Sequence, residues 1–168
     1  LVSVEAGREK KYKMEVGAGK SVAGFVIPEL LSRRVVEVIC SNWDLTCNFA
    51  HNPEPLAEHL TDLCARVVSE RADMGIAVDP DVDRLVFVQE DGQLFGEEYT
   101  LVSVADYVLS ENPGNTVSNL SSTRALRDVT SRHGGSYFAA AVGEVNVVTK
   151  MKQVGAVIGG EGNGGVIY

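Results

Sequence analysis

The chain has 168 residues, of which 45% are hydrophobic and 23% are charged, and its net charge at pH 7 is −8. Such a composition is that of a globular protein with room for one domain or two small ones. The negative charge disfavours nucleic acid as a partner, because phosphate backbones are bound by clustered Lys and Arg, and no apolar run approaches the roughly 20 residues of a membrane span. We therefore expect neither nucleic acid nor a membrane as a partner.

The cysteines Cys40, Cys47 and Cys64 are odd in number and lack the CxxC spacing of a zinc site. This pattern favours reduced thiols and a cytoplasmic location, and no signal peptide is recognised. Residues 119–121 match the N-glycosylation sequon, which we interpret as incidental without a secretory signal. The chain does not begin with Met, so we expect a piece of a longer protein.

In the first half of the chain, strand and helix patterns alternate, as in an α/β fold with a largely parallel sheet. The predicted strands are short apolar or β-branched runs, at residues 12–16, 35–40, 74–78 and 85–89. Residues 28–33 are predicted to form the body of one helix. A second, amphipathic helix is predicted over residues 56–67, with Pro55 helping to start it.

A second unit of the same kind is predicted to begin near Gly96. Its predicted helices cover residues 101–108, 124–133 and 144–154, and its predicted strands cover residues 116–120, 136–142 and 156–158. The first helix stops at the NPG sequence that begins at Asn112, and Ser122 or Thr123 caps the second. The predicted fold is two consecutive three-layer α/β/α units, residues 1–95 and 96–168, with mixed, mainly parallel sheets, the second unit truncated.

The most informative segment is MGIAVDPDVDR at residues 74–84, where an apolar strand runs into three aspartates at alternate positions. Alternate residues of an extended loop project to the same side, so Asp79, Asp81 and Asp83 are predicted to converge. Close carboxylates repel one another unless a cation lies among them, and oxygen ligands suit Mg2+ or Ca2+ better than zinc. Arg84 adds a planar cation suited to a phosphate oxygen. The alternative interpretation is a solvated acidic turn.

Two other loop types compete with this interpretation. In a helix-flanked calcium loop that starts at Asp79, Glu90 falls at the required twelfth position, but Arg84 replaces the required glycine and strands flank the loop. In a nucleotide-binding P-loop at residues 17–21 (GAGKS), the first glycine of the motif is replaced by Met14. A degenerate P-loop stays as an alternative, and a glycine-rich strand-to-helix turn is preferred.

The DPDVDR loop resembles the metal-binding loop of the α-D-phosphohexomutases, the phosphoglucomutase and phosphomannomutase family, which has the form DxDxDR after a strand. Residues 160–165 (GEGNGG) resemble the family's sugar-recognition loop, GExSG, with Asn163 in place of the usual serine. An amide can still donate and accept hydrogen bonds to a hydroxyl. Residues 121–126 (SSTRAL) and 142–146 (VGEVN) are also similar in order and spacing. The resemblance covers nearly the whole chain, as the family's second domain with the metal loop and most of its third with the sugar loop.

The resemblance implies an isomerase that moves a phosphoryl group between the 1- and 6-positions of a hexose phosphate, through a phosphoserine and a bisphosphorylated sugar. Mg2+ is the implied cofactor and hexose phosphate the implied substrate. The implied metal ligands are Asp79, Asp81 and Asp83. Arg84 is the implied catalytic residue, in contact with the phosphoryl group. The implied sugar-binding residues of the second loop are Glu161 and Asn163.

The family's catalytic serine lies in a TASHNP segment of its first domain. Residues 51–53 (HNP) could be mistaken for that segment, but Ala50 precedes them and offers no hydroxyl. We therefore expect that the first and fourth domains are missing from this chain and that the chain alone is inactive. The sequence does not specify glucose, mannose or glucosamine. A non-catalytic module that binds a divalent ion is the alternative function.

Overall fold

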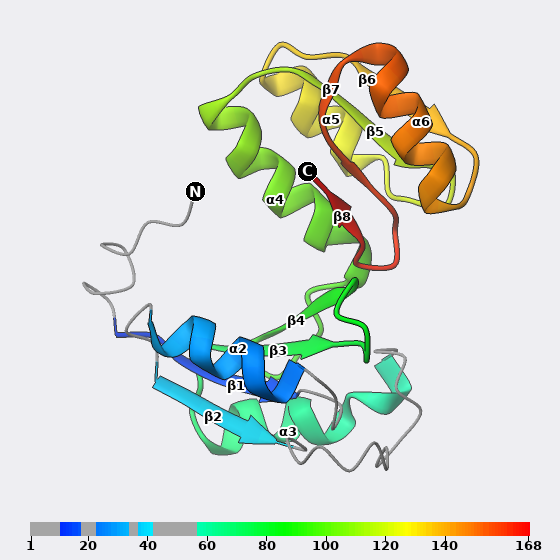
Figure 1. Cartoon of the computed structure of the whole chain (residues 1–168). Helices are drawn as coiled ribbons and strands as arrows, with labels where there is room; N and C mark the ends of the chain where they lie inside the picture. The colour runs from blue at the N-terminus through cyan, green and yellow to red at the C-terminus, as the bar shows by residue number, and fades with distance from the viewer. Residues whose placement is uncertain (1–10, 18–22, 34–36, 42–56) are drawn as a thin grey trace. The chain divides into compact units, whose positions relative to one another are not determined.

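The computed structural model describes residues 11–17, 23–33, 37–41 and 57–168, which divide into two units, Leu1–Phe95 and Gly96–Tyr168. Each unit is an α/β unit with one four-stranded, mixed, mainly parallel sheet and helices against it (Figure 1). The predicted fold class is confirmed in this respect. The glycine-rich turn after Gly17, the HNP sequence at 51–53 and Cys47 lie outside the described residues.

The sheet of unit 1 has the strand order β2-β1-β3-β4. Its strands are β1 (Lys13–Gly17), β2 (Glu37–Ser41), β3 (Met74–Val78) and β4 (Leu85–Gln89). Strand β1 runs parallel to both β2 and β3, whereas β3 and β4 pair antiparallel. The chain therefore reverses direction between Val78 and Leu85, within the aspartate loop.

Two apolar clusters cover the two faces of this sheet. The helix α2 (Ala23–Ser32) places Ile27 and Leu31 in the cluster that contains Val16 and Ile76. The other cluster joins α3 (Thr61–Ser69) to Ala77 of β3 and to Val86 and Val88 of β4, whereas Ile76 and Val78, which flank Ala77, belong to the first cluster. This alternation is the period of two that a strand with both faces covered must have.

One charged side chain is buried in the face that α3 covers. Glu15 of β1 has no exposed surface, and its Oε1 accepts a hydrogen bond of 2.8 Å from Nε of Arg66 on α3. A buried carboxylate is costly unless it is paired. The pair therefore links α3 to the strand β1.

The sheet of unit 2 has the order β6-β5-β7-β8, with β5 parallel to β6 and β7, and β7 antiparallel to β8. Its strands are β5 (Asn115–Asn119), β6 (Tyr137–Ala140), β7 (Ala156–Gly160) and β8 (Val166–Ile167). Its helices are α4 (Glu97–Glu111), α5 (Ala125–Arg132) and α6 (Glu144–Val154). Residues of α4 and α5 share one apolar cluster with Ile158, and α6 packs through Val147 against Val117 on the other face.

Several predicted boundaries were wrong. The amphipathic helix predicted over residues 56–67 is a 3-10 turn, η1 (Ala57–His59), followed by α3. Leu60 lies between them with φ −104° and ψ 8° yet is buried, so the apolar spacing continues where the helix does not. The helix whose body was predicted at residues 28–33 is α2, which spans Ala23–Ser32 and contains Pro28.

In unit 2, the predicted cap is displaced, since Arg124 is the N-cap of α5, although the Thr123 hydroxyl accepts a hydrogen bond from N of Ala125 at 3.3 Å. Strand β6 is shorter than predicted. Strand β8 was not predicted, because two residues are too few for a periodic signal.

None of the helices within the described ranges combines the length and the hydropathy needed to cross a bilayer.

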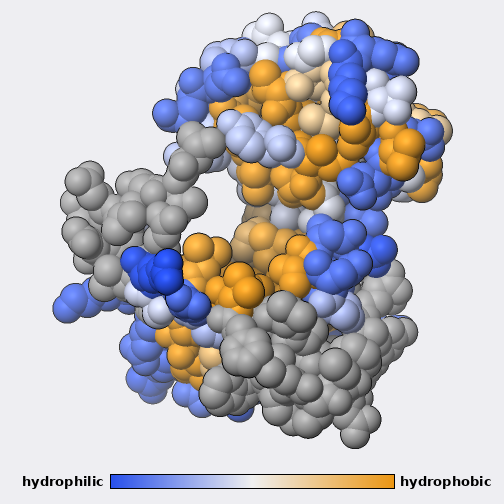
Figure 2. All heavy atoms as spheres, in the orientation of Figure 1, coloured by the Kyte–Doolittle hydropathy of each residue, from blue (hydrophilic) through white to orange (hydrophobic). Residues whose placement is uncertain are grey.

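Figure 2 shows hydrophobic residues at the surface of each unit. Three of the most exposed ones, Leu120, Val142 and Val145, follow the carboxyl ends of β5 and β6.

Gly75→Ala is expected to destabilise unit 1 by about 1–3 kcal/mol, the range for overpacking a dense core. An added Cβ would lie 2.6 Å from Cγ2 of Val67 and 2.9 Å from Cβ of Val88. Gly17→Ala is the matched control, because its Cβ would meet nothing closer than Cδ2 of Leu63 at 3.6 Å among the described neighbours. Urea denaturation followed by amide NMR signals of each unit measures both. Equal losses in the two variants would contradict this explanation.

Candidate functional site

Two loops occupy the same topological position in their respective units. The loop at residues 79–84 joins β3 to β4, and the loop at residues 161–165 joins β7 to β8. Each follows the carboxyl end of a strand that pairs parallel with its neighbour. Ligand sites of open α/β sheets form at such ends.

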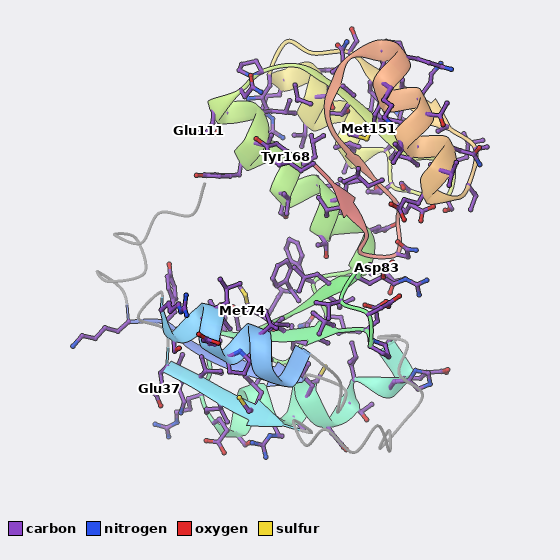
Figure 3. The ribbon with its side chains drawn as sticks, viewed as in Figure 1. Glu37, Met74, Asp83, Glu111, Met151 and Tyr168 are labelled. Atoms are coloured by element: carbon purple, nitrogen blue, oxygen red, sulfur yellow. The ribbon has the colours of Figure 1, made fainter. Side chains whose placement is uncertain are left out.

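The first loop brings three carboxylates together. One oxygen from each of Asp79, Asp81 and Asp83 lies within 4.8 Å of the other two. Asp79 is buried and the other two are exposed, and Asp83 lies on the turn between β3 and β4 (Figure 3). The cluster therefore has one fixed member at the strand end and two members open to solvent.

The three carboxylates lie close together, but the loop backbone is not extended as the sequence analysis predicted. It is a turn in which Oδ1 of Asp79 accepts hydrogen bonds from the backbone N–H groups of Asp83 and Arg84, each at 3.1 Å. N of Val82 donates to O of Asp79 at 3.2 Å, and Val82 has a φ of +64°, which a β-branched residue rarely adopts. Asp79 thus organises the backbone that presents the other two carboxylates.

Charge in the loop is unbalanced in the absence of a cation. Burial raises the pKa of the Asp79 carboxyl, and a hydrogen bond with Asp83 raises it further, whereas the N–H and the charge of Arg84 oppose the rise. Nε of Arg84 lies 3.7 Å from Oδ2 of Asp79 and 3.8 Å from Oδ1 of Asp83. One arginine cannot neutralise three carboxylates, so a bound cation would favour the ionised forms.

The donor set fits a hard divalent cation. All three candidate ligands are carboxylate oxygens, and Oδ1 of Asp79 is engaged by backbone N–H groups, which leaves Oδ2 on the side of Arg84. Mg2+ bonds of 2.0–2.1 Å place ligands on one octahedron about 3–4 Å apart, so modest side-chain rotations suffice. Because strands flank the loop, the helix-flanked calcium loop is excluded.

The second loop is closed by its own backbone and amide. N of Glu161 donates to O of Gly165 at 3.0 Å, and Oδ1 of Asn163 accepts from N of Gly165 at 3.1 Å. A Cβ at Gly162 would lie 2.8 Å from O of Ser121, so glycine lets the loop pack on the turn that follows β5. The loop therefore has a defined shape and a defined neighbour.

The carboxylate of Glu161 is held from two other strands. Its Oε1 accepts a hydrogen bond of 2.8 Å from Nδ2 of Asn119 at the end of β5, and one of 3.0 Å from N of Gly143 after β6. Three parallel strands thus contribute to one carboxylate.

Sequence reasoning assigned no role to these two partners. Gly143 lies within the VGEVN segment noted above, whereas the signal for Asn119 is its position at the carboxyl end of a strand in a parallel sheet. Asn119 is 3% exposed and donates to Glu161, which agrees with the interpretation that its sequon is incidental. The exposed apolar residue Leu120 follows Asn119 in the sequence, and the exposed apolar residue Val142 precedes Gly143.

The six predicted site residues fall into two groups. Asp79, Asp81, Asp83 and Arg84 belong to the loop of unit 1, and Glu161 and Asn163 belong to the loop of unit 2.

Comparison with known protein families covers both units. The model described as phosphoglucomutase/phosphomannomutase, alpha/beta/alpha domain II, matches residues 1–92. The model for domain III of the same family matches residues 96–168. The aspartate loop lies in the first match and the Glu161 loop in the second.

Curated relatives share about a third of their residues with this chain. A phosphoglucomutase/phosphomannomutase of Thermococcus kodakarensis is 34% identical over 169 residues, covering 99% of this chain and 37% of the relative. A phosphomannomutase/phosphoglucomutase of Pseudomonas putida is 36% identical over 158 residues, covering 92% of this chain and 34% of the relative. The chain thus spans little more than a third of the length of these relatives.

A solved structure shows the same similarity. The crystal structure of a phosphoglucomutase/phosphomannomutase family protein from Burkholderia thailandensis matches with a TM-score of 0.87 and 33% identity. The match covers 94% of this chain and 35% of that one.

Without divalent ions, Asp79→Asn is expected to stabilise unit 1 at neutral pH. Because the pKa of Asp79 is raised in the folded chain, its stabilising contribution is present at low pH and is lost as the pH rises through the folded pKa. The amide keeps an oxygen for the N–H groups of Asp83 and Arg84 but carries no charge.

Urea denaturation in EDTA across the acidic to neutral range measures this effect, and the gain should disappear at low pH. Asp62→Asn is the control, since Asp62 is exposed in the first turn of α3 and should give no gain. A loss of stability in Asp79→Asn at neutral pH would contradict the cost that burial implies.

Proposed function

Because the chain belongs to the phosphoglucomutase/phosphomannomutase family, we propose that it supplies the second and third domains of a Mg2+-dependent phosphohexomutase. The reaction is the transfer of a phosphoryl group between the 1- and 6-positions of a hexose phosphate. The observation that supports it most directly is the convergence of three carboxylates beside Arg84, in the segment that matches domain II.

In this proposal Asp79, Asp81 and Asp83 hold Mg2+. The bound ion supplies positive charge that stabilises a transferring phosphoryl group. Asp79 also fixes the backbone of the loop through its two hydrogen bonds, which brings the three carboxylates near one another. Because Ala50 precedes the HNP sequence here and offers no hydroxyl, the proposal assigns the phosphoryl donor to a phosphoserine of the family's first domain, which the matches to domains II and III do not include.

Arg84 contacts the transferred group. Its guanidinium lies beside two of the carboxylates and is about one third exposed, so part of it can reach a ligand. A guanidinium donates paired hydrogen bonds to phosphoryl oxygens and stays charged at every relevant pH. Arg84 would thus hold the phosphoryl oxygens while the aspartates bind the metal.

Glu161 and Asn163 bind the sugar. The Oε1 atom of Glu161 is already engaged, so Oε2 accepts from sugar hydroxyls. Oδ1 of Asn163 closes the loop, so its Nδ2 is the group left to donate to a sugar oxygen. The relatives' names include both mannose and glucose phosphates, so the proposed substrate is a hexose phosphate as a class.

The proposal is tested with the full-length protein and with this chain, each incubated with Mg2+ and a panel of hexose 1-phosphates. Phosphorus NMR follows the appearance of 6-phosphates. The full-length protein is expected to convert at least one substrate, and this chain none. Turnover by the chain alone would overturn the assignment of the phosphoryl donor, and tight ion binding without any turnover by the full-length protein would favour an ion-binding module.

Mg2+ is expected to bind this chain weakly, because three carboxylates provide only part of an octahedral shell. Asp81→Asn should lower the affinity further, by roughly tenfold or more, since it removes one charged ligand. Calorimetry on the chain measures both. Asp91→Asn, at an exposed acid in the turn after β4, is the control and should bind as the wild type does. Unchanged binding in Asp81→Asn would remove the loop from consideration.

Glu161→Gln in the full-length enzyme is expected to lower kcat/KM by roughly 10- to 150-fold, equivalent to about 1.5–3 kcal/mol for a hydrogen bond to a charged group. The amide oxygen can still accept from Asn119 and Gly143, so the amide nitrogen replaces the acceptor that faces the substrate.

Mg2+ affinity should stay unchanged in this variant, and Glu111→Gln, at an exposed position at the end of α4, should have no effect on either quantity. Lost metal binding with unchanged sugar kinetics would show that the two loops have been assigned the wrong roles.

A further inference from the structure

We propose that Asn119 is a positioning residue, which holds the Glu161 carboxylate by one oxygen so that the other oxygen is presented to a substrate hydroxyl. The inference rests on the proposed function of Glu161. It assigns a role to a residue that is far from both recognised loops in the sequence.

The register of the sheet places the two side chains together. Ser118 of β5 pairs with Gly160 of β7, so the next residues, Asn119 at the end of β5 and Glu161 just after β7, lie side by side. The distance from Nδ2 of Asn119 to Oε1 of Glu161 is 2.8 Å. This contact therefore follows from the strand pairing and needs no movement of the loop.

The orientation of the Asn119 amide is determined by its neighbours. Its Oδ1 accepts hydrogen bonds from the hydroxyls of Ser121 at 3.1 Å and Ser122 at 2.7 Å. Because both hydroxyls donate to Oδ1, the amide atom that faces Glu161 is the nitrogen, which donates to Oε1. The side chain is 3% exposed, which leaves little room for rotation. Asn119 is thus a fixed donor.

The carboxylate is held asymmetrically as a result. Gly143 donates its N–H to the same Oε1 atom at 3.0 Å, and no group in the described parts of the chain donates to Oε2. Two fixed donors on one oxygen define the plane and the direction of the carboxylate. Such preorganisation matters because small displacements of a substrate-binding group cost large factors in rate.

A matched control exists on the same strand. Asn115, at the opposite end of β5, also uses both ends of its amide: Nδ2 donates to O of Val154 at 2.9 Å, and Oδ1 accepts from N of Ser136 at 3.1 Å. It has the same residue type and a comparable structural role, but it does not contact Glu161.

The test is a double-mutant cycle in the full-length enzyme, with kcat/KM for the preferred hexose phosphate as the measured quantity. Asn119→Ala is expected to lower kcat/KM by roughly 10- to 100-fold when Glu161 is present. In the Glu161→Ala background the same substitution should have almost no effect, because Asn119 acts through Glu161. Asn115→Ala should lower the thermal stability of the protein but leave kcat/KM unchanged in both backgrounds.

Ser122→Ala provides a milder variant if Asn119→Ala does not fold. It removes one donor that fixes the amide, so it should lower kcat/KM by a smaller factor, again only when Glu161 is present. Equal factors in the two backgrounds, for either variant, would overturn the inference and indicate a general effect on folding. A wild-type enzyme without mutase activity would instead remove the proposed function, and the inference would fall with it.

Discussion

Both loops depend on one constraint, the reversal of the chain immediately after a strand that is mostly buried. Four of the five residues of β3 are buried, and so are the last three of β7. The backbone N–H groups of the following turn lose their strand partners and need new ones. Side chains supply acceptors in both cases: the carboxylate of Asp79 for Asp83 and Arg84, and the amide of Asn163 for Gly165. Residues that we propose to bind ligands thus also close their own turns.

The two loops meet this constraint with opposite electrostatics. Asp79 is partly desolvated among further carboxylates, which raises its pKa, so the loop of unit 1 is disfavoured in its fully ionised form until a cation binds. Glu161 is held instead by neutral N–H donors from Asn119 and Gly143. Such donors orient a carboxylate without neutralising it, and they leave an oxygen for a neutral hydroxyl. The same strand-end position therefore suits the two roles that we propose, metal binding in one unit and sugar binding in the other.

The parts of this structure that were predictable are those encoded by neighbouring residues. The bounds of β3, β4 and α6 agree with the predicted runs, because each is a continuous periodic segment between turn residues. Helix starts were less predictable: Leu60 is buried without being helical, and α2 begins at Ala23, before the predicted helix body. Burial determines the spacing of apolar residues, and this spacing is visible in the sequence as a periodic pattern. The ends of a helix are determined by capping and local dihedral angles, which produce no such pattern.

The same distinction separates the two candidate sites. The contacts that hold Asp79 come from residues four and five positions later, so a six-residue motif contains the whole arrangement. The contacts that hold Glu161 come from residues 42 and 18 positions earlier, which only the pairing of three strands brings together. The arrangement around Asp79 therefore depends mainly on the folding of its own loop. The geometry of the Glu161 carboxylate depends instead on the register between β5 and β7. Substitutions that shift this register would therefore alter the sugar binding that we propose without changing a residue of the GEGNGG loop.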